Sequence, residues 1–125
     1  MLKKIFAHRG ASAYAPENTL PAFEKAVDIG ADGVELDIHL SRDGRLVVIH
    51  DEMLDRTTNG HGFVKDFTLA ELKKLDASKT MTNSGFCNLR IPTLGEVYEL
   101  LADTELLVNV EVKNSIFPVS YTHLT

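Results

Sequence analysis

The residues best suited to chemistry lie in one stretch, residues 33–51, where carboxylates and histidines alternate with apolar side chains. Two β-patterned runs meet there at Asp43-Gly44, which is a strong signal for a tight hairpin. With Asp43 and Gly44 as the turn, counting outward gives the pairing of the runs, and directly opposed side chains share one face. That polar face would carry Glu35, Asp37, His39 and His50.

The other face of this ribbon would pack on a core. Its members would be Val34, Leu36, Ile38, Leu40, Val47 and Ile49. Carboxylates beside an imidazole, backed by an apolar face, suit a metal-assisted or an acid/base site. A Glu-x-Asp tripeptide on a strand more often belongs to a solvated outer face than to a metal site. Glu35 and Asp37 alone therefore favour a solvated face without a chemical role. The placement of His50 opposite Asp37 brings the metal or acid/base site and the solvated outer face nearer to equal weight.

Length and composition describe an ordinary globular chain of one domain. The 125 residues are 44% hydrophobic and 25% charged, which is typical of a protein with a buried core. A net charge of −5 without any run of Lys or Arg argues against nucleic acid as a partner. The single cysteine, Cys87, suits a reducing compartment. No apolar run is long enough for a membrane span or a signal-peptide core, so we expect a cytoplasmic protein.

The N-terminal part of the chain predicts a βαβ unit. A short apolar strand over residues 4–8 precedes a helix that Asn18 or Thr19 would cap and Gly30 would end. A second strand follows over residues 33–40. Strand, helix and strand with short links favour a parallel α/β sheet. Such sheets place their chemistry at the carboxyl ends of the strands.

A further parallel strand is predicted over residues 106–113, where near-continuous apolar character indicates a buried strand. Within it Asn109, Glu111 and Lys113 alternate onto one face. A charged pair at the end of a buried strand is costly unless it meets ions or ligands. Glu111 and Lys113 are therefore functional candidates. Together the strand ends would supply His8, Arg9, Glu35, Asp37, His50, Glu111 and Lys113.

Between these strands lies a polar excursion, residues 51–88. It carries several turn signals and one short helix that opens on a capping box, Thr68 and Glu71. A second capping box, Thr93 and Glu96, opens the helix that follows the excursion. The excursion would be either a lid over the site or an inert surface insertion.

The candidate residues together describe phosphate-ester cleavage. Three carboxylates suit a hard divalent cation such as Ca²⁺ or Mg²⁺ better than zinc. Arg9 and Lys113 can hold an anion, and two histidines can act as general base and general acid. His39 would line the site further out, whereas His61 would be a solvated loop residue.

Several short motifs follow one another along residues 5–113. They are His8-Arg9-Gly10, Pro16-Glu17-Asn18-Thr19, Glu35-Leu36-Asp37, Val48-Ile49-His50-Asp51, Asp55-Arg56-Thr57-Thr58-Asn59-Gly60, Ile91-Pro92-Thr93-Leu94 and Val110-Glu111-Val112-Lys113. In order and spacing this set resembles the glycerophosphodiester phosphodiesterase family. The resemblance covers nearly the whole chain and is specific because so many motifs agree.

The resemblance implies an α/β fold, the N-terminal portion of a TIM-type (β/α)8 barrel of the phospholipase C-like phosphodiesterase kind. Residues 51–88 would be its insertion after the second strand. It also implies hydrolysis of small-molecule glycerophosphodiesters, such as deacylated phospholipid headgroups, to glycerol 3-phosphate and an alcohol. Two alternatives stay open: a related phosphodiesterase that acts on another lipid headgroup, and an inactive fragment or headgroup-binding relic.

The resemblance further implies a role for each candidate residue. A divalent metal, Ca²⁺ or Mg²⁺, would be held by Glu35, Asp37 and Glu111, acid/base roles would fall to His8 and His50, and phosphate contacts to Arg9 and Lys113. The sequence does not say which histidine is the acid. It also leaves open whether water or a neighbouring hydroxyl of the substrate attacks the phosphorus.

The chain is shorter than a whole barrel requires. A (β/α)8 barrel has eight βα units in about 250 residues, whereas three barrel-type strands are predicted here. Residues 118–125 fit no βα continuation and look like the translation of a transposon-type sequencing adapter. We therefore expect residues 1–117 to be a partial domain and residues 118–125 a non-native tail, which excludes His123 from any site. We also expect the isolated fragment to be inactive.

Overall fold

The structure is a computed structural model that describes residues 3–113. The tail expected over residues 118–125 lies outside this range. In chain order the elements are β1 (Phe6–His8), α1 (Leu20–Asp28), β2 (Gly33–Leu40), β3 (Leu46–Val48), the 3-10 helix η1 (Val64–Asp66), α2 (Leu69–Leu72), the 3-10 helix η2 (Lys79–Ser84), α3 (Leu94–Leu101) and β4 (Leu107–Val112).

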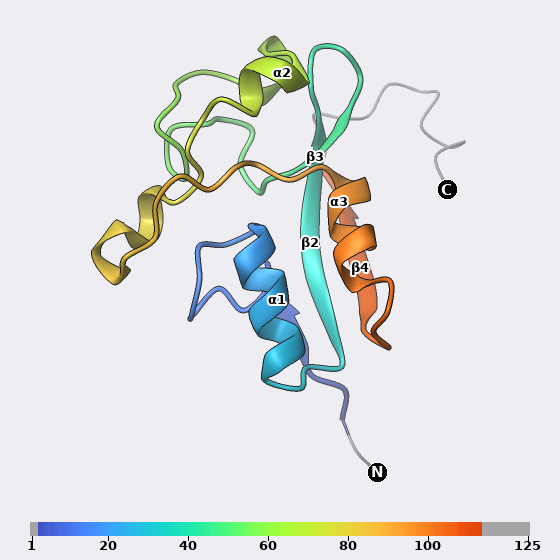
Figure 1. Ribbon diagram of the computed structural model, residues 1–125. Coiled ribbons are helices and arrows are strands. Elements are labelled where there is room, and N and C mark those ends of the chain that lie inside the picture. The colour runs from blue at the N-terminus through green and yellow to red at the C-terminus, as the bar shows by residue number, and fades with distance from the viewer. Residues whose placement is uncertain (1–2, 114–125) are drawn as a thin grey trace.

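β2 is the central strand of a four-stranded sheet. It pairs in parallel with β1 and β4 and antiparallel with β3. The order β1, α1, β2 confirms the predicted βαβ unit, and α3 leads into the further parallel strand, β4. In Figure 1, α1 and α3 run alongside the strands, while the segment that contains α2 gathers beyond the carboxyl end of β2. The sheet is therefore a partial one whose parallel strands all end toward that segment.

The main core lies between the sheet and these two helices. It comprises Ala11, Phe23, Ala26, Val34, Leu36, Ile38, Val48, Val97 and Leu101. Even-numbered residues of β2 thus face the helices. Because successive side chains of a strand point to opposite faces, Glu35, Asp37 and His39 point to the other side of the sheet.

The hairpin pairs its strands one residue away from the expected register. Ile38 lies opposite Val48, whereas a two-residue turn would place it opposite Ile49. The side-chain period of a strand is two, so a shift of one residue moves each side chain of β3 to the other face. The expected pairing of Asp37 with His50 is therefore wrong, and His50 approaches the site by another route.

The loop of the hairpin explains this shift, because it is one residue longer than expected and runs from Arg42 to Gly44. Ser41 donates its backbone N–H to the carbonyl of Arg45 over 2.9 Å. Gly44 has a φ of +79°, the left-handed position that three-residue hairpin loops fill with glycine. An Asp-Gly pair fits both loop lengths, so the sequence located the turn but not its length.

The shifted register gives the excursion a core of its own. Val47 and Ile49, expected in the main core, face the excursion instead. They form a second apolar cluster with Leu54, Val64, Leu72, Ala77 and Ile91. Residues 51–88 are thereby packed onto the hairpin through this cluster.

Truncation of Leu54 tests this second cluster. Leu54 is completely buried, so Leu54→Ala should lower the free energy of unfolding of the full-length protein by about 2–5 kcal/mol. Urea denaturation followed by circular dichroism measures the change. The neighbouring Met53 is 42% exposed, and Met53→Ala serves as the control, with an expected change of about 0.5 kcal/mol or less. Equal losses in the two variants would contradict the packed cluster.

The capping of the helices agrees with the sequence predictions at α2 and α3 but not at α1. Both predicted capping boxes are confirmed: at α2 and α3 the threonine hydroxyl accepts the N–H of the glutamate three residues later. α1 begins after Thr19, as expected, but the Thr19 side chain makes no capping hydrogen bond. Its hydroxyl donates to the carbonyl of Pro16 over 2.6 Å instead. Within residues 3–113, no helix has the length and apolar character needed to cross a bilayer.

β4 is more exposed than its sequence predicts. Exposed and half-buried residues alternate along it, and Leu107 is 47% exposed. Phe6 of β1 and Leu107 both lie in register with Gly33, on the side of the sheet that faces away from the helices. The expectation of a strand buried on both faces is wrong for the described residues, because they provide no layer over this part of that side.

Candidate active site

Three carboxylates converge near the carboxyl ends of β2 and β4. The register places Asp37 opposite Glu111, and Glu35 precedes Asp37 by two residues on the same face. One oxygen of each side chain lies within 4.8 Å of an oxygen of the other two. The Asp37 side chain is 1% exposed, whereas that of Glu111 is 58% exposed. Three hard oxygen donors at these separations fit the coordination chemistry of Ca²⁺ or Mg²⁺.

The charges of the cluster are only partly balanced. Burial and the charge of Asp37 raise the pKa of Glu35. Lys113 Nζ lies 3.1 Å from Glu111 Oε2 and 3.3 Å from Asp37 Oδ1. The hydrogen bond from Lys113 lowers the pKa of Glu111. Burial disfavours the charge of Lys113, but its bond to Glu111 and the nearby Asp37 outweigh burial and raise its pKa. A further cation here would be stabilising.

β1 brings His8 and Arg9 to the same face. His8 pairs in register with Glu35, and its Nε2 lies 3.6 Å from Glu35 Oε1. Arg9 has a φ of +56°, a constrained conformation for a residue with a side chain, and its N–H donates to Glu35 Oε1 over 3.3 Å. A Cβ on the next residue, Gly10, would lie 2.8 Å from Ala22 Cβ. The close packing of α1 therefore fixes this turn.

The side chain of Arg9 lies between two carboxylates. Its Nη1 donates to Glu17 Oε2 over 2.8 Å, and its Nε lies 3.9 Å from Asp37 Oδ2. That Nε is buried and makes no hydrogen bond within the described part of the chain. Asn18 Nδ2 donates to Asp37 Oδ2 over 3.2 Å, which holds the carboxylate in place. An unused buried donor beside the cluster is suited to an anion bound there.

His50 joins the site from the segment that follows β3. Its Nδ1 lies 2.8 Å from Asp51 Oδ1, which leaves Nε2 available for proton transfer. Asp51 accepts hydrogen bonds from Arg56 Nε and Nη2 over 2.8 and 3.0 Å. These bonds lower the pKa of Asp51 to about 2. Asp51 is thus ionised at neutral pH and orients the imidazole.

Arg56 connects the His50 branch of the site with the Arg9 branch. Its Nη1 donates to Glu17 Oε1, and Glu17 also binds Arg9. Burial acts to raise the pKa of Glu17, but the hydrogen bonds from Arg56 and Arg9 outweigh it and lower that pKa. The resulting network comprises, in order, His50, Asp51, Arg56, Glu17 and Arg9.

The predicted residues are thus brought together in two groups. Direct contacts join His8, Arg9, Glu35, Asp37, Glu111 and Lys113, and His50 joins them through the network. Sequence reasoning placed none of Glu17, Asn18, Asp51 and Arg56 in the site and considered Asn18 only as a helix cap, although all four lie in the quoted motifs. Their membership in those motifs is the signal that could have identified them.

The two remaining histidines of the described chain differ from each other. His39 was expected to line the site, but it is 2% exposed and its Nε2 lies 3.0 Å from the carbonyl oxygen of His50. Burial lowers the pKa of His39. It is therefore a buried structural residue that supports the backbone of His50. His61 is 81% exposed and pairs with Asp55, in agreement with a loop residue in contact with solvent.

The low pKa of Asp51 predicts a pH dependence of stability. Since the folded-state pKa of about 2 lies below the ordinary aspartate pKa of 3.8, ionised Asp51 stabilises the fold above about pH 4. This contribution, about 2 kcal/mol or less, is lost as the pH falls toward 2. Asp51→Asn should therefore be less stable than the unmodified protein at pH 6, and the difference should vanish near pH 2. Urea denaturation at both values measures it; a difference independent of pH would contradict the assignment.

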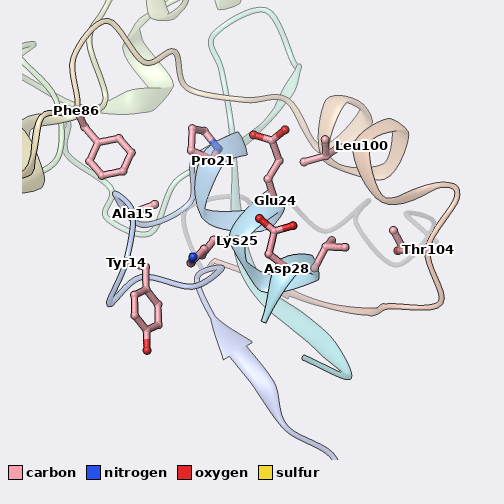
Figure 2. A pocket seen from close by; sticks show the side chains of 10 residues that line it. Tyr14, Ala15, Pro21, Glu24, Lys25, Asp28, Phe86, Leu100 and Thr104 are labelled. Carbon is pink, nitrogen blue, oxygen red and sulfur yellow. The ribbon is translucent and has the colours of Figure 1, made fainter. Parts of the chain in front are cut away.

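A separate depression lies on the outer side of α1 and has a volume of about 600 Å³. Figure 2 shows Tyr14 and Lys25 on one side of it, with Phe86 and Leu100 on others. None of the candidate site residues line this depression. It is a groove between the outer helices, so the chemistry is assigned to the strand ends.

Comparisons with known proteins point to one family. A sequence model described as "Glycerophosphoryl diester phosphodiesterase family" matches residues 8–122. A glycerophosphodiester phosphodiesterase of Caldanaerobacter subterraneus subsp. tengcongensis is 59% identical over 112 residues, which are 90% of this chain and 46% of the relative. The chain thus spans about half the length of the curated relatives it matches.

Two solved structures share the fold. The glycerophosphodiester phosphodiesterase of Agrobacterium tumefaciens str. C58 superposes with a TM-score of 0.83 at 43% identity, over 89% of this chain and 47% of its own. A phosphodiesterase of Oleispira antarctica, in complex with the product sn-glycerol-3-phosphate, gives 0.83 at 42% identity, over 90% of this chain and 45% of its own. The partial sheet is the N-terminal portion of a TIM-type (β/α)8 barrel. The chain belongs to the glycerophosphoryl diester phosphodiesterase family.

Proposed function

We propose that the full-length protein hydrolyses glycerophosphodiesters to glycerol 3-phosphate and an alcohol, with a divalent metal ion and two histidines. The observation that carries this proposal is the convergence of three carboxylates, within 4.8 Å of one another, with Arg9 and His8 in a member of this family. The product found in the Oleispira antarctica structure supports the same reaction. The exposed Cys87 suits the reducing cytoplasm as the site of action.

The metal ion would be held by Glu35, Asp37 and Glu111. Their donor set contains only carboxylate oxygens, which favours Ca²⁺ or Mg²⁺ over softer metals. The raised pKa of Glu35 supports this assignment, because a cation would relieve the repulsion between neighbouring carboxylates. When bound, such an ion supplies Lewis-acid stabilisation of charge on phosphoryl oxygens.

The phosphate group would be bound by Arg9 and Lys113. The buried Nε of Arg9 has no hydrogen-bond partner among residues 3–113, and Glu17 holds the guanidinium in a fixed orientation through Nη1. Lys113 lies within 3.3 Å of Asp37 and Glu111, so its ammonium would lie beside the bound phosphate. Both cations would neutralise the charge that builds up on the non-bridging oxygens.

The two proton transfers would fall to His8 and His50. His50 has its Nδ1 engaged with Asp51, so Nε2 is the atom that would exchange a proton with the substrate. The side chain of His8 is 65% exposed on the same face as the carboxylates. One imidazole takes the proton of the attacking hydroxyl or water, and the other gives a proton to the leaving alcohol.

A substrate panel tests the proposal against its nearest rival. The full-length protein would be incubated with glycerophosphocholine, glycerophosphoethanolamine, phosphatidylinositol and sphingomyelin, and released phosphate monoesters would be followed by phosphorus NMR. The proposal predicts glycerol 3-phosphate from the first two and no cleavage of the intact lipids. Cleavage of an intact lipid headgroup alone would assign the protein to the rival phosphodiesterases. No cleavage of any substrate would favour the headgroup-binding relic.

A further inference from the structure

Arg56 lies in the excursion, outside the sheet that carries the carboxylates, yet its guanidinium binds two acidic side chains of the site. Nε and Nη2 donate to the two oxygens of Asp51 over 2.8 and 3.0 Å. Nη1 donates to Oε1 of Glu17. Three donors of one planar group are thus divided between two carboxylates that lie 34 positions apart in the sequence.

Each of these carboxylates holds a different candidate residue. Asp51 Oδ1 lies 2.8 Å from Nδ1 of His50. Glu17 accepts a hydrogen bond from Nη1 of Arg9 over 2.8 Å. A change at Arg56 would therefore reach both the imidazole and the guanidinium of the site. Arg56 itself stands apart from the reacting centre, since its described contacts are with the two carboxylates.

We propose that Arg56 is a positioning residue, which sets the relative placement of His50 and Arg9 through Asp51 and Glu17. The inference rests on the proposed function, since it concerns the geometry of that reaction. A bidentate bond fixes the rotation of the Asp51 carboxylate, and hence the orientation of the His50 ring. The bond from Arg56 Nη1 fixes the carboxylate of Glu17, whose side chain is 9% exposed. Glu17 in turn fixes the guanidinium of Arg9.

The guanidinium geometry is essential to this role. An ammonium is a point charge with rotatable donors, so a lysine would supply the charge of Arg56 without the fork that spans both carboxylates. The alternative is that Arg56 only fastens the excursion to the rest of the fold. The Arg56 side chain is 45% exposed, and exposed ion pairs contribute little to stability. This exposure favours the positioning role, because removal of the side chain would leave no buried cavity.

Arg42 provides a matched control. It also joins the hairpin to the excursion, through the carbonyl of Asp66 at 3.1 Å and Glu71 at 3.5 Å. Its side chain is 59% exposed, and its described bonds reach none of the candidate site residues. Arg42→Ala therefore removes an arginine side chain with similar contacts, as Arg56→Ala does, but leaves the network between His50 and Arg9 unchanged.

The test is a kinetic comparison in the full-length protein with glycerophosphocholine as substrate. We expect Arg56→Ala to lower kcat/KM by about 100-fold, the usual cost of a misplaced catalytic group. Arg56→Lys should reach about a tenth of the kcat/KM of the unmodified protein, since it restores the charge but not the geometry. Added methylguanidinium should raise the activity of Arg56→Ala about tenfold, whereas methylammonium should not. Arg42→Ala should keep activity within about twofold.

A double-mutant cycle with Asp51→Asn separates positioning from simple loss of structure. If Arg56 acts through Asp51, the double variant should be no slower than the slower single variant, within about twofold. Multiplied losses, or an Arg56→Ala enzyme as active as Arg42→Ala, would overturn the role of Arg56. If Arg56→Ala does not fold, the cycle is run with Arg56→Lys and decided by the same criterion. An inactive unmodified enzyme would instead refute the proposed function itself.

Discussion

Replacement of His50 by alanine in the full-length protein should lower kcat for glycerophosphodiester hydrolysis by about 10²- to 10⁴-fold, the range of general acid/base catalysis. The Asp51 carboxylate, 2.8 Å from Nδ1, fixes the ring so that Nε2 can exchange a proton with the substrate. Alanine removes that atom and leaves the Asp51 and Arg56 pair intact. Single-turnover kinetics with glycerophosphocholine would measure the chemical step directly.

His61 provides the control for this substitution. It is an exposed histidine that also pairs with an aspartate, Asp55, at 3.0 Å, but it lies in the excursion away from the carboxylates. His61→Ala should keep kcat within about twofold. A loss of less than about tenfold in His50→Ala, well short of the acid/base range, would remove His50 from the assigned role.

Replacement of Asp37 by asparagine should cost about 10³-fold in turnover or more, because a metal ligand contributes several kcal/mol to charge stabilisation. Asp37 is the most buried of the three carboxylates; it accepts a hydrogen bond from Asn18 and forms an ion pair with Lys113. Asparagine keeps the volume but removes the charge, so it separates metal binding from packing. Titration with Mn²⁺, followed by electron paramagnetic resonance, would measure the accompanying loss of metal affinity.

Asp28, at the exposed end of α1, supplies the control for Asp37. Asp28→Asn removes one surface carboxylate and should keep both Mn²⁺ affinity and turnover within about twofold. If Asp37→Asn binds Mn²⁺ as tightly as the unmodified protein, Asp37 is not a metal ligand. Activity that persists in that variant would equally contradict the assignment.

The parallel sheet and the polar strand ends were predictable from the sequence, and the hairpin register was not. The βαβ order follows from element types and short links, so the meeting of His8, Glu35 and Glu111 needs only the parallel pairing of their strands. The register of β3 depends on the loop between Ser41 and Arg45. One extra loop residue reverses every face assignment beyond it.

The network around Arg56 shows a second limit. Arg56 and Glu17 are 39 positions apart, and no periodicity of strand or helix relates two such distant residues. Their bond depends on how the excursion packs on the hairpin through the second apolar cluster. Likewise, the burial of His39 depends on that packing, so a residue expected to line the site became a structural one.

The most direct test of metal-dependent hydrolysis is the release of glycerol 3-phosphate from glycerophosphocholine by the full-length protein, before and after removal of divalent cations. We predict that a chelator abolishes the activity and that excess Ca²⁺ or Mg²⁺ restores it. The 125-residue chain, assayed in parallel, should be inactive, because it spans about half the length of its relatives. Release of glycerol 3-phosphate that is unchanged by the chelator would contradict a metal centre on Glu35, Asp37 and Glu111.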